Sequence, residues 1–65
     1  MKHYIRIYYI TRDVFIINKI KDRFSTIVSV NMESYITTDD YGAFLLEETE
    51  RRGYIRIRER SIKDM

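Results

Sequence analysis

Cysteine, proline, tryptophan and glutamine are all absent from this 65-residue chain, and glycine occurs only twice. Without cysteine the chain has neither a disulfide framework nor a thiolate zinc site. Gly42 and Gly53 are too few and too far apart for a glycine-rich phosphate loop. A lone histidine, His3, cannot by itself supply a metal site or a catalytic triad. We therefore expect a non-enzymatic protein, without cofactor or metal, whose fold depends on packing.

Long hydrophobic runs are also lacking. No run of apolar residues exceeds four, whereas a membrane-spanning helix needs about 20. Met1, Lys2 and His3 lead directly into a strand-like pattern, so no signal peptide is expected. The net charge of +2 is small for a protein that coats duplex DNA. These features predict a cytoplasmic protein that does not associate with membranes.

Isoleucine, arginine, tyrosine and glutamate are plentiful instead. The chain is 45% apolar and 34% charged, which is the balance of a globular protein. Residues 1–65 form a single domain near the lower size limit for independent folding, so a partner subunit would add useful core. The few thermolabile and many charged residues are typical of thermophilic proteins, although the lack of proline argues the other way.

The tetrapeptide Tyr-Ile-Arg-Ile occurs near both ends of the chain, at residues 4–7 and 54–57. Its two-residue alternation predicts strands over residues 4–10 and 54–60, with the isoleucines pointing into the core. Between them, Thr11 or Asp13 can cap a helix whose apolar side carries Ile16, Ile17, Ile20 and Phe24. Residues 14–17 alone could equally form a strand that closes a hairpin.

A second helix is indicated after residues 37–40, which offer cap residues and negative charge. This explains Asp39 and Asp40 without a catalytic role. Tyr41, Phe44 and Leu45 form the apolar stripe that we expect to face the sheet, while residues 47–52 are almost wholly polar. Gly53 is placed for the left-handed cap that ends the helix.

Residues 25–38 alternate throughout and have two interpretations. Two strands joined near Asn31 and Met32 give the order β-α-β-β-α-β, a ferredoxin-like α+β sandwich with a four-stranded antiparallel sheet and two helices on one face. The alternative is β-α-β-α-β with one long central strand, which at ~3.3 Å per residue would run about 43 Å and need a partner chain to cover it. A dimer fits both.

One face of the predicted sheet has a distinct chemical character. Alternation places tyrosine and arginine side chains together on the outer face: Tyr4, Arg6, Tyr8, Tyr35, Tyr54, Arg56 and Arg58. With Arg60, the last strand would carry a stripe of arginines at about the spacing of phosphates along a nucleic-acid strand. The arrangement resembles the RNA-recognition module, which binds through sheet aromatics, although the Gly-Phe signature of that module is absent here.

Three functions follow from this face. The first is protein–protein association, including homodimerisation, because tyrosine and arginine are favoured at interfaces. The second is binding of single-stranded RNA or DNA through stacked tyrosines and arginine–phosphate contacts. The third is a small inhibitor or accessory factor of the kind that viruses encode, which fits the size of the chain. Tyrosine and arginine also suit a sheet face that binds nothing.

Overall fold

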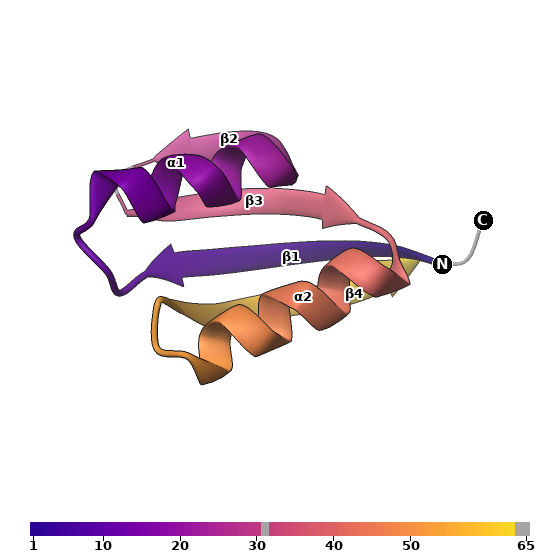
Figure 1. Ribbon diagram of the computed structural model, residues 1–65. Coiled ribbons are helices and arrows are strands. Elements are labelled where there is room, and N and C mark those ends of the chain that lie inside the picture. Colours follow the sequence, from indigo (N-terminus) through magenta and orange to yellow (C-terminus); the bar gives the residue numbers. More distant parts are fainter. Residues whose placement is uncertain (31, 64–65) are drawn as a thin grey trace.

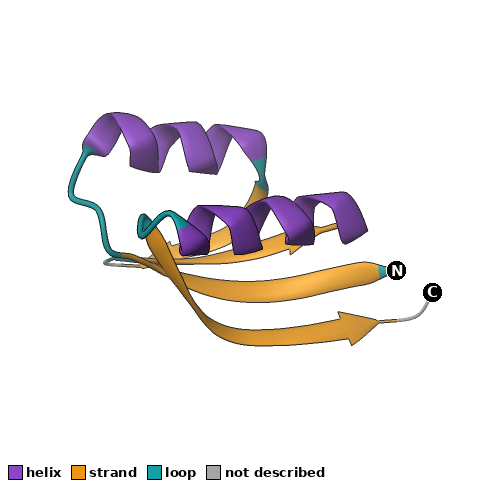
Figure 2. Ribbon diagram, turned by 60° about the horizontal axis from the view of Figure 1, so that its bottom comes forward, coloured by secondary structure: helices purple, strands orange, loops and turns teal. Residues whose placement is uncertain are grey.

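A computed structural model describes residues 1–30 and 32–63, with side chains described for 1–24 and 32–63. The elements are β1 (Lys2–Tyr9), α1 (Val14–Arg23), β2 (Ser25–Val30), β3 (Glu33–Thr38), α2 (Asp40–Arg51) and β4 (Ile55–Lys63). Neighbouring strands are antiparallel and lie in the order β2-β3-β1-β4. Both helices lie in front of the sheet in Figure 1 and on the same side of it in Figure 2. The other face of the sheet is therefore open.

The core lies between the sheet and the helices. Alternate residues of β1 point into it, and all of Ile5, Ile7 and Tyr9 are buried. The other strands and the helices complete the cluster with Ile36, Ile55, Ile20, Phe24, Ala43 and Leu46. The prediction that isoleucines of the first and last strands point inward is confirmed at Ile5, Ile7 and Ile55, because each is at most 2% exposed.

The predicted element order β-α-β-β-α-β is observed, with the strands in the order β2-β3-β1-β4, but the pairing across the sheet is irregular. Register shifts interrupt both outer pairings. On β4, Ile57 and Glu59 oppose consecutive residues of β1, which leaves Arg58 unopposed in a β-bulge.

The alternative with one long central strand is wrong. β2 and β3 pair with each other in antiparallel fashion, and Val30 lies opposite Glu33. Met32 belongs to the connecting turn, and Asn31, the other residue predicted for it, lies outside the described residues. The chain therefore reverses direction between two short strands.

Helix α1 begins where local chemistry predicts. The Asp13 carboxylate accepts a hydrogen bond from the Phe15 amide at 3.0 Å, which satisfies one of the free donors of the first turn. Ile20 and Phe24 are buried and Ile16 and Ile17 are half-buried, so the predicted apolar side is confirmed. The alternative of a strand over residues 14–17 is wrong.

Helix α2 has the predicted caps but a different buried side. Asp39 accepts a hydrogen bond from the Gly42 amide at 2.8 Å, and Gly53 has a φ of 88° just beyond the helix. Small residues face the sheet, since Gly42 and Ala43 are buried with Leu46. The prediction that Tyr41, Phe44 and Leu45 face the sheet is wrong, because Tyr41 and Phe44 are exposed and Leu45 is only half-buried.

Candidate functional site

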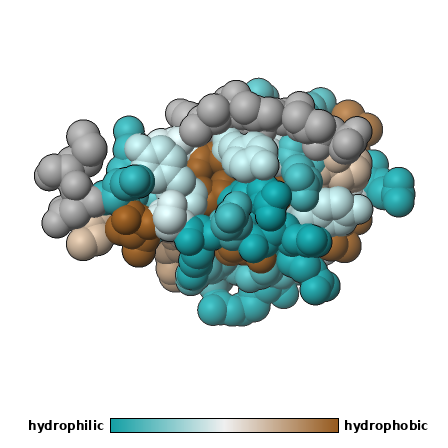
Figure 3. Space-filling model, turned by 180° about the vertical axis from the view of Figure 1, so that it is seen from behind, coloured by the Kyte–Doolittle hydropathy of each residue, from teal (hydrophilic) through white to brown (hydrophobic). Residues whose placement is uncertain are grey.

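The open sheet face is the surface of β1, β3 and β4 on the side away from the helices. Residues that oppose each other across a ladder share a face, so the register assigns the following set to it: Lys2, Tyr4, Arg6 and Tyr8 of β1, Glu33, Tyr35 and Thr37 of β3, and Arg56, Glu59, Ser61 and Lys63 of β4. Figure 3 views the molecule from behind and shows a predominantly hydrophilic surface with paler areas between the strongly polar ones.

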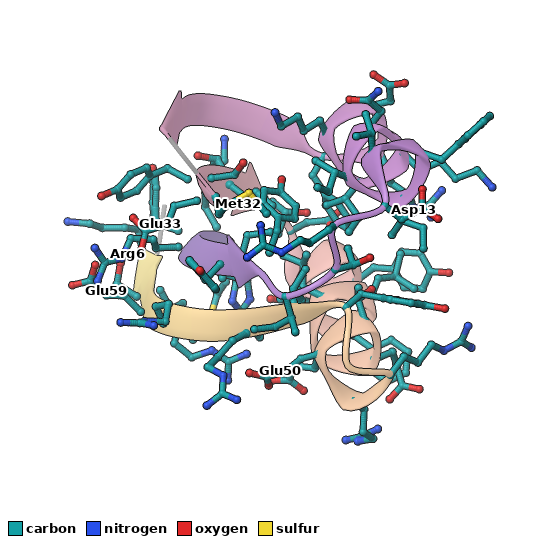
Figure 4. The ribbon with its side chains drawn as sticks, turned by 90° about the vertical axis from the view of Figure 1, so that its left-hand side faces the viewer. Arg6, Asp13, Met32, Glu33, Glu50 and Glu59 are labelled. Atoms are coloured by element: carbon teal, nitrogen blue, oxygen red, sulfur yellow. The ribbon has the colours of Figure 1, made fainter. Side chains whose placement is uncertain are left out.

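Arg6 lies at the centre of this face and is half-buried. Its neighbours across the ladders are Tyr35 and Glu59. The guanidinium carbon lies 6.0 Å from the centre of the Tyr35 ring, and Nε lies 3.5 Å from a Glu59 carboxylate oxygen. Figure 4 shows Arg6 together with Glu33 and Glu59 at the sheet side of the molecule. A hydrogen bond with Tyr35, followed by the charges of Glu59 and Glu33, raises the pKa of Arg6. Arg6 is therefore a permanent cation whose partners belong to the same chain.

A second arginine–tyrosine pair lies beside the first. Arg58, the unopposed residue of the β-bulge, extends over Tyr8 with its guanidinium carbon 5.9 Å from the ring centre. Arg56 opposes the same tyrosine across the ladder and is exposed. An arginine within about 6 Å of an aromatic ring gains a cation–π attraction. In both pairs, an arginine of the same chain thus covers part of the tyrosine ring.

A hollow of ≈ 230 Å³ lies on this face next to the cross-strand neighbours of Arg6. Tyr4, Tyr35, Glu59 and Ser61 contribute side chains to its lining, and each of the two tyrosines is 37% exposed. Two polar atoms of the face, Arg6 Nε and Thr37 Oγ1, are buried without a hydrogen-bond partner among the described residues. Arg6 Nε still has its ion-pair contact with Glu59 at 3.5 Å.

The structure brings six of the seven predicted site residues together and separates the seventh. Tyr54 precedes β4, which begins at Ile55, so the strand alternation does not extend to it. Its carbonyl accepts hydrogen bonds from the amides of Ile10 and Thr11, and Tyr54 lines a groove between the helices instead.

The predicted stripe of arginines along the last strand is wrong. The β-bulge at Arg58 changes the face on which later residues lie, and Arg60 opposes the buried Ile5. Its guanidinium donates a hydrogen bond to Glu47 of α2 at 2.6 Å, on the helix side of the sheet. Arg60 therefore does not continue the surface of Arg56.

Sequence reasoning missed the acidic members of the open face. Glu59 faces away from it under strict alternation, and only the β-bulge turns this residue toward Arg6. Glu33 opposes Tyr8 at the start of β3. Glu59 lies between two arginines in the sequence, which is a visible signal. Nothing in the sequence, however, shows where the β-bulge lies.

His3 contacts the start of helix α2. Its Nε2 lies 2.6 Å from a carboxylate oxygen of Asp40, and the His3 side chain is only 14% exposed. This contact, followed by the charge of the chain terminus, lowers the pKa of Asp40. Asp39 thus caps helix α2, and Asp40 connects this helix to β1.

No group of three or more histidine, cysteine or carboxylate residues in the described part of the chain is arranged to hold a metal ion. None of the helices described is long and apolar enough to cross a membrane. Comparison with protein families, with curated proteins and with solved structures finds no match to this chain.

Proposed function

We propose that this is a small non-enzymatic binding or regulatory protein that associates with other protein chains, first of all with a second copy of itself, through the open sheet face. The observation that carries the proposal is the state of Arg6. It is half-buried, lies against Tyr35 and is neutralised by Glu59 of its own chain. The centre of the face is therefore aromatic and electrically balanced, as protein interfaces are.

The size of the face suits an interface. A standard interface buries about 800 Å² on each partner, which is roughly one sixth of the 4717 Å² surface of this chain. One broad side of a two-layer protein offers such an area. Tyrosine and arginine are also the residues that most often dominate binding energy when they lie centrally.

Charge on the face is compatible with a symmetric pair. Glu59 is 69% exposed even though it contacts Arg6, so one of its sides is free to meet a cation. Arg56 and Arg58 are exposed on the same face. In a two-fold arrangement each patch meets itself, so an arginine of one copy can pair with Glu59 of the other.

Single-stranded nucleic acid is the second candidate, and the charge excess of the face favours it. The face carries more cations than acids. Its five cations are Lys2, Arg6, Arg56, Arg58 and Lys63, and its two acids are Glu33 and Glu59. A positive groove with aromatic rings binds unpaired bases and phosphates. Against this, two of the arginines are already stacked on Tyr35 and Tyr8, which leaves fewer free ring faces for bases.

The test compares two double variants by light scattering and sedimentation. Tyr35→Ala/Arg56→Ala removes exposed side chains of the open face, and Tyr41→Ala/Arg12→Ala removes the same residue types elsewhere on the surface. We expect the wild type and the control to dimerise and the face variant to be monomeric with an unchanged circular dichroism spectrum. Loss of a tyrosine that is a hot spot weakens association by about 30-fold or more.

The same proteins are titrated against labelled single-stranded RNA and DNA over a range of salt concentrations. Micromolar binding that falls steeply with salt and is lost in the face variant would replace protein association by nucleic-acid binding. A wild type that stays monomeric at millimolar concentration would refute homodimerisation. Equal behaviour of the two double variants would show that the open face is not the interface.

A further inference from the structure

A groove of ≈ 480 Å³ separates α1 from α2 on the side of the molecule opposite the open sheet face. Both helices lie above the sheet in Figure 2, and each packs onto strands beneath it. The side chains between them are mainly apolar. Those that form the floor are Ile16, Ile20, Phe24 and Leu45.

The rim of the groove is positively charged. Lys19 and Arg23 are one helical turn apart on the same edge, and Arg52 lies at the other edge just after α2. Among the described residues, none of these three cations takes part in an ion pair. The acidic lining residue Glu48 is bonded to Arg51. Three cations thus lie around an apolar floor without a counter-charge of their own.

We propose that this groove binds a long-chain carboxylate, with the hydrocarbon chain on the apolar floor and the carboxylate between Lys19 and Arg23. At ≈ 480 Å³ the groove is of a size that can take a small ligand such as dodecanoate. Pockets for small ligands commonly range from about 300 to 1,000 Å³ and combine an apolar lining with a few polar groups that fix orientation. The site is separate from the open face and does not depend on self-association.

The arrangement of charge explains why the ligand is an anion. An apolar floor alone would accept any hydrophobic molecule. Because Lys19 and Arg23 are adjacent on one helix face, both can donate hydrogen bonds to one carboxylate, and charge-assisted bonds of this kind are the stronger ones. Leu45 and Ile16 are half-buried in the free protein, so an acyl chain would cover apolar surface that water now contacts.

The experiment is calorimetric titration of the wild type with sodium dodecanoate below its critical micelle concentration. We expect saturable binding of one molecule per chain and a melting temperature that rises with ligand concentration. Decanoate should bind up to about 15-fold more weakly, because each fully buried methylene contributes about fourfold. Dodecanol, which has the chain but no charge, should bind at least 10-fold more weakly than dodecanoate.

Two double variants with the same change in net charge locate the site. Lys19→Glu/Arg23→Glu reverses one edge of the groove and should reduce dodecanoate affinity at least 10-fold. Arg12→Glu/Lys21→Glu alters two cations of the same region that do not line the groove, and it should leave affinity unchanged. Arg52→Glu tests the opposite edge if the first double variant does not fold.

Several results would overturn the proposal. These are the absence of saturable binding, equal affinity for dodecanol, equal loss in both double variants, or a melting temperature that falls as dodecanoate is added. Binding to vesicles of anionic phospholipid, or to an acidic amphipathic peptide, without binding of monomeric dodecanoate would assign the groove to a membrane or to a protein partner instead. Neither outcome would alter the scattering test of the open face.

Discussion

The buried hydrogen bond between Tyr9 and Ser34 gives the sharpest prediction about stability. The two hydroxyl oxygens lie 2.8 Å apart, and the residues are 2% and 0% exposed. Tyr9→Phe removes one hydroxyl and leaves the Ser34 hydroxyl buried without this partner. A buried polar group that loses its partner costs about 1–3 kcal/mol. For a domain of this size each kcal/mol lowers the melting temperature by about 4–8 °C.

A double-mutant cycle separates this bond from packing effects. Ser34→Ala should lower the unfolding free energy by about as much as Tyr9→Phe does. It leaves the buried Tyr9 hydroxyl without its hydrogen-bond partner. The double variant should be more stable than the sum of the two losses predicts, by about 0.5–3 kcal/mol. Urea unfolding gives all the free energies, and Tyr41→Phe, at an exposed tyrosine, is the matched control with a change within about 0.5 kcal/mol. Strictly additive losses would refute the reasoning.

The same tyrosine predicts a response to alkaline pH. Burial raises the pKa of Tyr9, and the Ser34 hydrogen bond opposes this effect only in part. The unfolded chain therefore releases the phenolic proton at a lower pH than the folded protein does. The resulting contribution to stability is complete below about pH 10, the unfolded pKa, and is lost as pH rises through the folded pKa. In Tyr9→Phe the fall of unfolding free energy between about pH 9 and pH 11 should be shallower, and an unchanged slope would contradict this.

Three further predictions concern α2. Gly42→Ala should lower the unfolding free energy by about 1–3 kcal/mol, because a Cβ there would lie 1.8 Å from Thr38 Oγ1. This loss is expected even though alanine favours helices. A melting temperature equal to or above that of the wild type would contradict the contact. Glu50→Ala should cost about 1–2 kcal/mol in urea unfolding, since its carboxylate accepts a backbone hydrogen bond from β4 at 2.7 Å. His3 lowers the pKa of Asp40, so the stability that this carboxylate adds is present above its unfolded pKa, about 3.9, and is lost as pH falls through the folded value. His3→Ala should flatten the acid side of the stability–pH curve, and a curve of unchanged shape would contradict the assignment.

Features fixed by neighbouring residues could be predicted from the sequence. The caps at Asp13 and Asp39 and the left-handed Gly53 each depend on a few adjacent residues, and all three are as expected. The apolar side of α1 follows from helical spacing alone. These predictions succeed because the chemistry that decides them lies within one or two turns of the chain.

The buried side of α2 could not be predicted from residue size. Tyr41 and Phe44 are the larger apolar residues, but the helix approaches the sheet through Gly42 and Ala43 and places the two aromatic rings in solvent. The gain is a close fit: carboxylates from the polar half of the helix reach β4, where Glu50 binds the Ile57 amide. The buried side of α2 is thus decided by packing between elements that are distant in sequence. The hydrophobic pattern of the helix alone does not encode which side is buried.

The candidate site was predicted in outline for the same reason. Alternation is local, so it correctly grouped Tyr4, Arg6 and Tyr8 on one side of β1, opposite the buried isoleucines. It failed at both ends of the last strand. Tyr54 precedes the strand, and the β-bulge at Arg58 reverses the faces of the residues after it. A one-residue shift is enough to move a side chain to the other face of a sheet.

The β4 edge of the sheet is closed to the addition of another strand, which bears on how two copies could meet. The Ile57 amide donates to Glu50, and Arg60 is held by Glu47 of the same helix. The β-bulge further distorts the edge. A strand with one edge amide occupied, its backbone kinked and its flanks charged is a poor template for pairing. Association along this edge would first have to break these contacts, whereas the open face is already exposed. Glu50→Ala frees the edge, so assemblies larger than a dimer should form in this variant alone, and their absence would show that the bulge and the charged flanks suffice to block pairing.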